Sequence, residues 1–145
     1  EVEAAYFAAR EAYLAAAQDP TNEELREGIA ETYTGANLEL TLKQLDELAT
    51  TASFAEVDPD SPPSALFLEG PVLVESDAAL ADMVICEVNS ERYLQRPAGA
   101  AEPVVIRDEP VVVRVFVRLE FVDGAWKSQS GDVLARVSTE DECFP

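Results

Sequence analysis

The chain has 145 residues and no histidine, and its 29 Asp and Glu against 10 Lys and Arg give a formal net charge of −19. This length fits a single domain over residues 1–145, and 48% hydrophobic residues are enough for a core. Such a charge makes nucleic acid and anionic membrane surfaces unfavourable partners, because their phosphate groups are repelled. Without histidine, the usual general base at neutral pH and the imidazole ligand of zinc are both excluded.

The first fifty residues have the spacing of amphipathic helices. Apolar residues recur every three or four positions in a first segment that we expect to end near Asp19-Pro20. Thr21 or Asn22 is a suitable N-cap for a second helix, which Thr34-Gly35 interrupts. Leucines at positions 38, 42, 45 and 48 continue the same periodicity. The pattern predicts three consecutive helices.

From residue 52 onward the pattern changes to that of strands. Three prolines predict a loop over residues 58–63. Strand-like stretches follow at 65–75 and 79–88, then a polar segment, and then the run 111–122 with apolar residues at every odd position. Asp123-Gly124 is typical of a two-residue hairpin turn into a last strand. Helices followed by antiparallel strands predict an α+β fold with the helices on one face of a sheet.

The hairpin turn also sets a register for the last two strands. It pairs Phe121 with Trp126, Glu120 with Lys127, and Arg118 with Gln129. A bulge at Gly131 is then expected, because it keeps later apolar residues on the buried face. These residues are Val133, Ala135 and Val137, opposite Val115, Val113 and Val111. Ser128 and Ser130 precede the bulge on the inner face, either as a pocket wall or as a strand end that reaches solvent.

The two cysteines predict a disulfide. Cys86 lies in an apolar run, whereas Cys143 lies in a polar tail and has no packing reason to be there unless it is tied down. A Cys86–Cys143 bond indicates an oxidising, extracytoplasmic compartment. No apolar run approaches the roughly 20 residues of a membrane-spanning helix. The chain begins in helical sequence at Glu1, and we expect a leader or lipid-anchor segment to precede it.

Three short motifs, spread over nearly the whole chain, resemble the nuclear-transport-factor-2-like (SnoaL-like) superfamily, especially its exported, often lipoprotein-type actinobacterial members. They are AYFAAREAYLAAAQDP at residues 5–20, ETYTG at 31–35, and VDGAWK at 122–127. The resemblance implies N-terminal helices packed in a strongly curved antiparallel sheet. Such a sheet forms a cone with a pocket inside, and its outer face commonly pairs two copies.

The resemblance leaves two functions open. The first is an exported, non-enzymatic accessory or interaction domain that binds a small apolar ligand in the cone. The alternative is a carboxylate-dependent isomerase, cyclase or hydratase that acts on a hydrophobic, ring-bearing substrate. That chemistry requires a carboxylate base paired with a tyrosine or a protonated acid. The missing histidine favours the non-enzymatic function.

The candidate site residues follow from these expectations. Asp82 is the candidate catalytic carboxylate, because it interrupts an apolar strand, and it points either inward or to a solvent-exposed strand edge. The candidate pocket residues are Tyr6, Tyr13, Tyr33, Trp126 and Ser128, although the positions of the tyrosines favour core residues with the hydroxyl at the edge.

The outer sheet face has its own candidates. It is either a solvated surface or a homodimer interface, and its residues are Arg114, Phe116, Arg118 and Gln129. The acidic loop with Glu56, Asp58 and Asp60 lacks the ligand spacing of a calcium loop, so we interpret it as a solvated turn and expect no metal. No phosphate-binding or nucleophile motif occurs, and no cofactor is expected.

Overall fold

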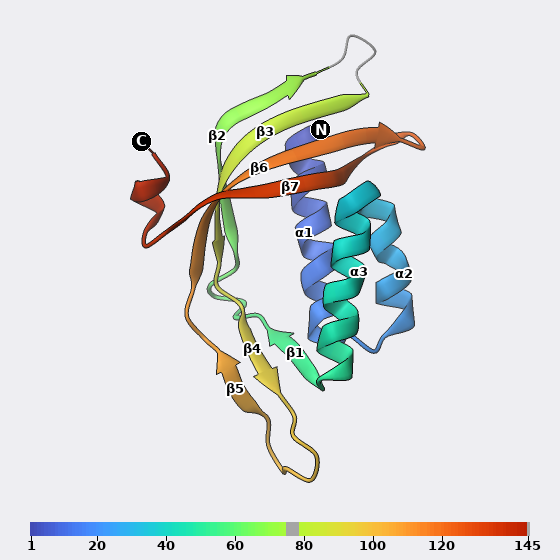
Figure 1. Cartoon of the computed structure of the whole chain (residues 1–145), viewed down its shortest axis with the longest axis vertical. Coiled ribbons are helices and arrows are strands. Elements are labelled where there is room, and N and C mark those ends of the chain that lie inside the picture. The colour runs from blue at the N-terminus through green and yellow to red at the C-terminus, as the bar shows by residue number, and fades with distance from the viewer. Residues whose placement is uncertain (75–78, 145) are drawn as a thin grey trace.

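A computed structural model describes residues 1–74 and 79–144 of the chain (Figure 1). Three helices come first, then strands and a short C-terminal 3-10 helix. Their bounds are α1 Val2–Gln18, α2 Glu23–Thr32, α3 Gly35–Thr50, β1 Ser53–Glu56, β2 Ser64–Leu73, β3 Leu80–Asn89, β4 Arg92–Gln95, β5 Val104–Arg107, β6 Val111–Val122, β7 Ala125–Val137 and η1 Glu140–Cys143. The predicted α+β class is confirmed. The predicted strand 65–75 has its last residue outside the described ranges.

The strands form two antiparallel sheets. One has the order β2-β3-β6-β7 and the other the order β1-β4-β5. Figure 1 shows the three helices on one side of the curved larger sheet, with β4 and β5 extending beyond it. The short strands β1, β4 and β5 were not predicted, because they are only four residues long and their segments lack a regular apolar alternation. Among the described residues, no helix is both long and apolar enough to span a membrane.

The main core lies between α1 and the inner face of the sheet. Odd-numbered residues of β3 and β6, among them Ile85 and Leu119, pack there against Val2 and Tyr6. A second apolar cluster joins the three helices around Ile29 and Leu45. These two clusters fix the position of the helices over the sheet.

The C-terminal segment covers part of the outer sheet face. Cys86 and Cys143 form the predicted disulfide, with their Cα atoms 5.8 Å apart, and both are fully buried. Val112 completes this third cluster, and Val88 and Val137 pack against it. Strand β3 is therefore apolar on both faces, because η1 covers its outer side at Cys86.

The register of the β6–β7 hairpin matches the prediction near the turn and departs from it at Arg118. Phe121 pairs with Trp126, and Glu120 with Lys127. The bulge lies at Gln129 rather than at Gly131, so Arg118 pairs with Ser130. The cause is the α2–α3 junction: the Thr34 N–H donates to the Ser128 carbonyl at 2.9 Å and holds β7 at this point.

A second, unpredicted bulge at Leu134 changes the facing of the end of β7. Val133 pairs with Val115 as expected, but Ala135 pairs with Arg114 on the outer face and Arg136 pairs with Val113 on the inner face. The expected burial of Val133 is also wrong, because its side chain is 56% exposed. It lines a pocket rather than the core.

Candidate functional site

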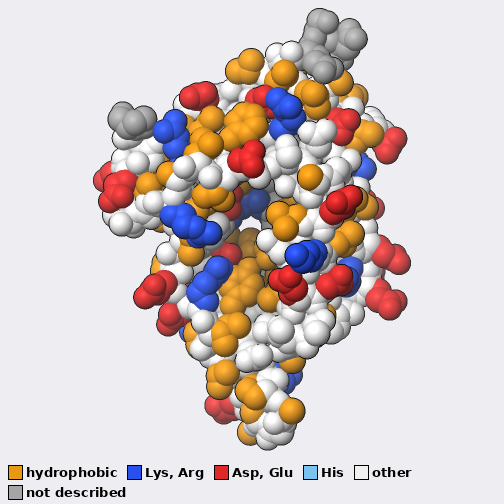
Figure 2. All heavy atoms as spheres, in the orientation of Figure 1, with side chains coloured by type: hydrophobic (Ala, Val, Ile, Leu, Met, Phe, Trp, Pro, Cys, Tyr) orange, Lys and Arg blue, Asp and Glu red, His pale blue; other side chains and the backbone are white. Residues whose placement is uncertain are grey.

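An open pocket of about 350 Å³ lies between the helices and the inner face of the sheets. Figure 2 shows this side of the molecule hollowed near its middle, with basic side chains beside hydrophobic ones. The lining comes from α1, α3, the α2–α3 junction and five strands, with Glu91 between β3 and β4: Tyr6, Arg10, Tyr13, Leu14, Tyr33, Asn37, Gln44, Glu87, Asn89, Glu91, Tyr93, Arg107, Val111, Val113, Val115, Val117, Ser128, Gly131, Val133 and Arg136. The volume falls in the range of small-molecule sites.

One side of the pocket is an apolar floor. The odd-numbered valines of β6, from Val111 to Val117, point to the inner face of the sheet, and Val133 of β7 extends the floor toward solvent. Their alternation on one strand follows from the two-residue period of a pleated strand. The floor offers an apolar surface to a bound molecule.

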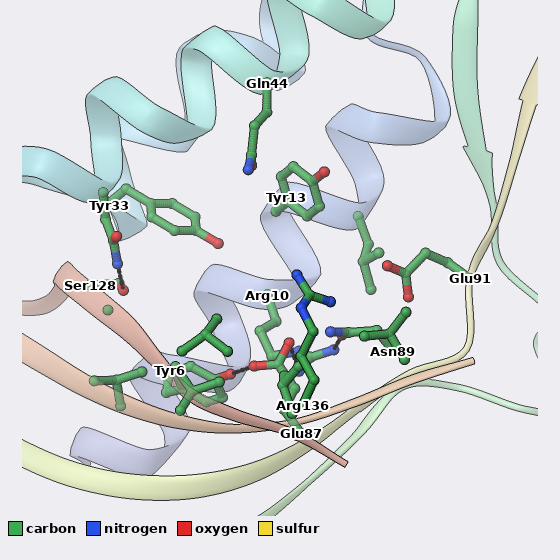
Figure 3. A pocket seen from close by; sticks show the side chains of 18 of the residues that line it. Tyr6, Arg10, Tyr13, Tyr33, Gln44, Glu87, Asn89, Glu91, Ser128 and Arg136 are labelled. Carbon is green, nitrogen blue, oxygen red and sulfur yellow. Dashed lines mark hydrogen bonds and ion pairs between the residues drawn. The ribbon is translucent and has the colours of Figure 1, made fainter. Parts of the chain in front are cut away.

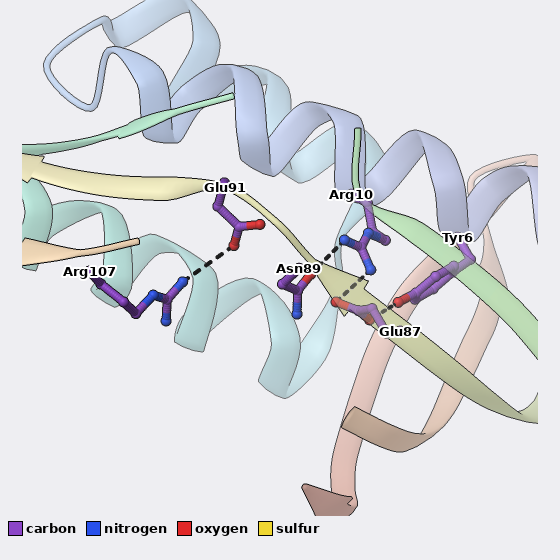
Figure 4. Close-up of polar contacts among 6 residues, drawn as sticks. All are labelled: Tyr6, Arg10, Glu87, Asn89, Glu91 and Arg107. Carbon is purple, nitrogen blue, oxygen red and sulfur yellow. Dashed lines mark hydrogen bonds and ion pairs between the residues drawn. The ribbon is translucent and has the colours of Figure 1, made fainter. Parts of the chain in front are cut away.

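A connected polar network lies next to this floor (Figure 4). The Tyr6 hydroxyl donates to the Glu87 carboxylate, and the Arg10 guanidinium forms an ion pair with Glu87 at 2.5 Å. Arg10 also donates to the Asn89 side-chain oxygen at 2.6 Å. Burial is the largest single effect on the pKa of Arg10 and lowers it, but Glu87, Tyr6 and Glu91 together outweigh burial and raise this pKa. The positive charge of Arg10 is therefore balanced by Glu87 within the network.

The helix and strand periods explain how this network forms. Tyr6, Arg10 and Tyr13 are spaced by four and three residues, so they lie on one face of α1. Glu87 and Asn89 are two residues apart on β3 and share its inner face. Two regular elements therefore bring an arginine and a carboxylate together.

A second polar group lies at the end of the pocket formed by the smaller sheet. Glu91 is 5% exposed and pairs with Arg107 at 3.5 Å. Burial raises the pKa of Glu91 despite the opposing effects of Arg107 and Arg10. The Arg107 guanidinium lies 4.4 Å from the ring centre of Tyr93, whose hydroxyl is 3.1 Å from that of Tyr13.

Three other polar side chains point into the pocket from three different elements. Figure 3 shows the Tyr33 hydroxyl, the Gln44 amide and the Arg136 guanidinium facing the open space. Within residues 1–74 and 79–144, none of the three has a side-chain hydrogen bond or ion pair. Burial raises the pKa of Tyr33, so its hydroxyl stays protonated at neutral pH and is able to donate. These groups are available to a ligand.

The α2–α3 junction positions Tyr33 against β7. Tyr33 and Ser128 form an isolated backbone bridge, and Asn37 donates to the Ser128 hydroxyl at 2.9 Å. Gly35 permits this approach, because its φ of +52° disfavours other residues and a Cβ there would lie 3.0 Å from the Gln129 side chain. The ETYTG segment therefore helps to build the pocket wall.

Four of the five residues expected in the pocket line it: Tyr6, Tyr13, Tyr33 and Ser128. Trp126 does not, because it packs against the main core and stacks edge-on with Phe121 at 5.4 Å between ring centres.

Asp82 lies outside the pocket, on the outer sheet face. Its carboxylate accepts two hydrogen bonds from Arg118, at 2.6 and 2.7 Å. The inward orientation considered for Asp82 is wrong, because the inner face of β3 carries the odd-numbered residues instead. The carboxylates inside the pocket are Glu87 and Glu91.

The expected interface residues are only partly together. Arg114, Phe116 and Arg118 share the outer face of β6 and are half-buried. Gln129 lies in the bulge of β7, where its amide donates to the Glu120 carboxylate on the outer face of β6 at 3.4 Å and its side chain also lies close to Gly35.

None of the charged residues that line the pocket was among the residues expected from the sequence. Glu87, Asn89 and Glu91 follow Ala81, Met83 and Ile85 at two-residue spacing, so the same alternation could have placed them on the inner face. The position of Arg136 had no such signal, since it depends on the bulge at Leu134.

The pocket chemistry suits hydrogen bonding and charge pairing. Over the described ranges, no group of three or more His, Cys, Asp or Glu side chains is arranged to hold a metal ion. The four pocket tyrosines all have a raised pKa, chiefly because of burial, so they remain neutral donors and acceptors.

No protein-family model matches the chain, and no curated protein matches it. Among solved structures, the chain is similar to the intermembrane space region of the chloroplast protein ARC6, with a TM-score of 0.61 and 14% sequence identity. The match covers 93% of this chain and 97% of the ARC6 chain. At this identity, the likeness shows a shared fold.

Proposed function

We propose that this chain is an extracytoplasmic, non-enzymatic domain of the nuclear-transport-factor-2-like type that binds a small molecule inside its cone. The open pocket with three unengaged polar side chains carries the proposal. A structural core would satisfy such groups internally or replace them with apolar residues. The valine floor fits the apolar ligand expected from the sequence, and the polar groups extend the expectation to a ligand that has a polar end as well.

The disulfide supports the proposed compartment. Cys86 and Cys143 are both buried in the bonded state, and such bonds persist in oxidising surroundings rather than in the cytosol. The three N-terminal helices on one side of a curved antiparallel sheet support the proposed family type.

The enzymatic alternative has less support. A carboxylate does lie within hydrogen-bonding distance of a tyrosine, as that chemistry requires, but Glu87 is also paired with Arg10. Both oxygens of this carboxylate are already engaged, one by Tyr6 and the other by Arg10, so neither is free to approach a substrate.

We also propose that two copies associate through the outer sheet face. Phe116 lies on β6 two residues after Arg114, which pairs with Cys86 next to the part of this face that η1 covers. Phe116 is only half-buried, so part of its ring is accessible to a second copy.

A fragment screen by protein-observed NMR tests the ligand-binding proposal. We expect hits whose chemical-shift changes map to the pocket, and we expect Val133→Trp to abolish their binding by filling the pocket mouth. Val133 is 56% exposed, so this change leaves the core intact. The matched control is Val105→Trp, at a 48% exposed valine of β5 outside the pocket. Hits that bind equally to both variants, or no hits at all, would contradict the proposal.

A further inference from the structure

The end of strand β7 brings an arginine into the pocket against the local sequence pattern. Simple alternation from Val133 would put Ala135 on the inner face. The bulge at Leu134 instead places Arg136 opposite Val113, whose side chain belongs to the pocket floor. Bulges are often found beside binding sites, where they redirect a side chain.

Arg136 is also the cation that the pocket leaves unmatched. Of the three arginines in the lining, Arg10 is paired with Glu87 and Arg107 with Glu91. Arg136 has no ion-pair partner within residues 1–74 and 79–144. The chain has a net charge of −19, so carboxylates are abundant and an ordinary surface arginine would be expected to pair with one. An unpaired arginine that faces a pocket is therefore unexpected.

The surroundings of Arg136 restrict the kind of anion that fits. Figure 3 shows its guanidinium directed toward the space that Tyr33 and Gln44 also face. Glu87 and Glu91 line the same pocket, so a doubly charged group such as a phosphate would be repelled more strongly than a singly charged one. A guanidinium binds a carboxylate through two parallel hydrogen bonds. The valine floor accepts an apolar body attached to that carboxylate.

We propose that the pocket selects small monocarboxylates with an apolar, ring-sized body, and that Arg136 binds the carboxylate at the pocket mouth. The ring lies over the valines of β6, and the Tyr33 hydroxyl and the Gln44 amide donate to the remaining oxygen lone pairs. This inference rests on the proposed ligand-binding function and adds the ligand class and the residue that recognises it.

The test compares 2-naphthoate with 2-naphthamide, a pair that differs in the carboxylate alone, by calorimetric titration of the full chain. We expect the wild type to bind 2-naphthoate about tenfold or more tightly than the amide, because a charge-assisted pair is lost with the amide. Arg136→Gln should abolish this preference without lowering the melting temperature, since Arg136 is exposed. Arg136→Lys should keep part of it, because the charge remains and the paired geometry is lost.

The control is Arg96→Gln, which changes the net charge equally at a residue that lies over Phe54 and lines a separate hollow. It should keep the full preference. Equal binding of the two compounds by the wild type, or an unchanged preference in Arg136→Gln, would overturn the inference while leaving the ligand-binding proposal intact. If neither compound binds and the fragment screen also gives no pocket hits, both proposals fail.

Discussion

Replacing both cysteines, Cys86→Ala/Cys143→Ala, should remove a large part of the stability of the fold. The disulfide joins residues 57 positions apart, and closing a loop of that length lowers the entropy of the unfolded chain by an amount worth about 4 kcal/mol. Small domains have a total free energy of unfolding of about 5–15 kcal/mol. Both residues are fully buried, so the variant also loses packing around Val112. The double variant should therefore remain folded, but with a small free energy of unfolding.

Equilibrium unfolding in urea measures this loss. With an m-value of about 2 kcal/mol/M, a loss of about 4 kcal/mol lowers the urea midpoint by about 2 M. The wild type with reductant should approach the midpoint of the variant. Val112→Ala is the matched control, because it removes buried atoms from the same cluster and keeps the bond, and its effect should be clearly smaller. A midpoint change below about 0.5 M in the double variant would refute this reasoning.

Two further predictions concern a buried carboxylate and the outer sheet face. Burial raises the pKa of Glu91 in the folded state above its ordinary value of 4.5, which applies to the unfolded state. Between the pKa of the unfolded state and that of the folded state, the folded state binds more protons. The free energy of unfolding therefore falls as the pH rises through this window. Glu91→Gln should accordingly gain stability relative to the wild type on going from pH 4 to pH 7, and urea unfolding that gives the same difference at both pH values would contradict this expectation. Phe116→Glu should shift a dimer toward monomer in sedimentation velocity at high micromolar concentration, because it adds a like charge to both copies; a wild type that is already monomeric there would exclude the dimer.

Much of the fold could be predicted because its determinants are local. The helices follow from the three- and four-residue spacing of apolar side chains, and Asn22 caps α2 as expected by accepting from the Leu25 N–H at 3.2 Å. Strand β6 begins and ends at the predicted residues, Val111 and Val122, because its alternation is regular. The four-residue strands lack a regular apolar alternation that would indicate them, and β1 in addition depends on pairing with the distant β4.

The site was harder to predict, because its orientation depends on what covers each sheet face. Both faces of β3 are apolar near Cys86, and only the C-terminal segment explains the apolar outer side. Asp82 shares the face of Val84 and Cys86 and was therefore considered as an inward residue, whereas Glu87 on the actual inner face was not. The tyrosines were found because they lie on buried helix faces, whereas Arg136 enters the pocket through a bulge that tertiary contacts produce.

The two bulges of β7 have a consequence for how related chains are to be aligned with this one. Deleting a bulge residue, Gln129 or Leu134, would leave every other residue of the strand opposite its present partner, since the bulge residue itself has none. Evolution can therefore add or remove one residue at either point without changing which side chains line the pocket. An alignment that confines gaps to loops would assign the wrong residues to the interior, and Arg136 would be exchanged for its neighbour.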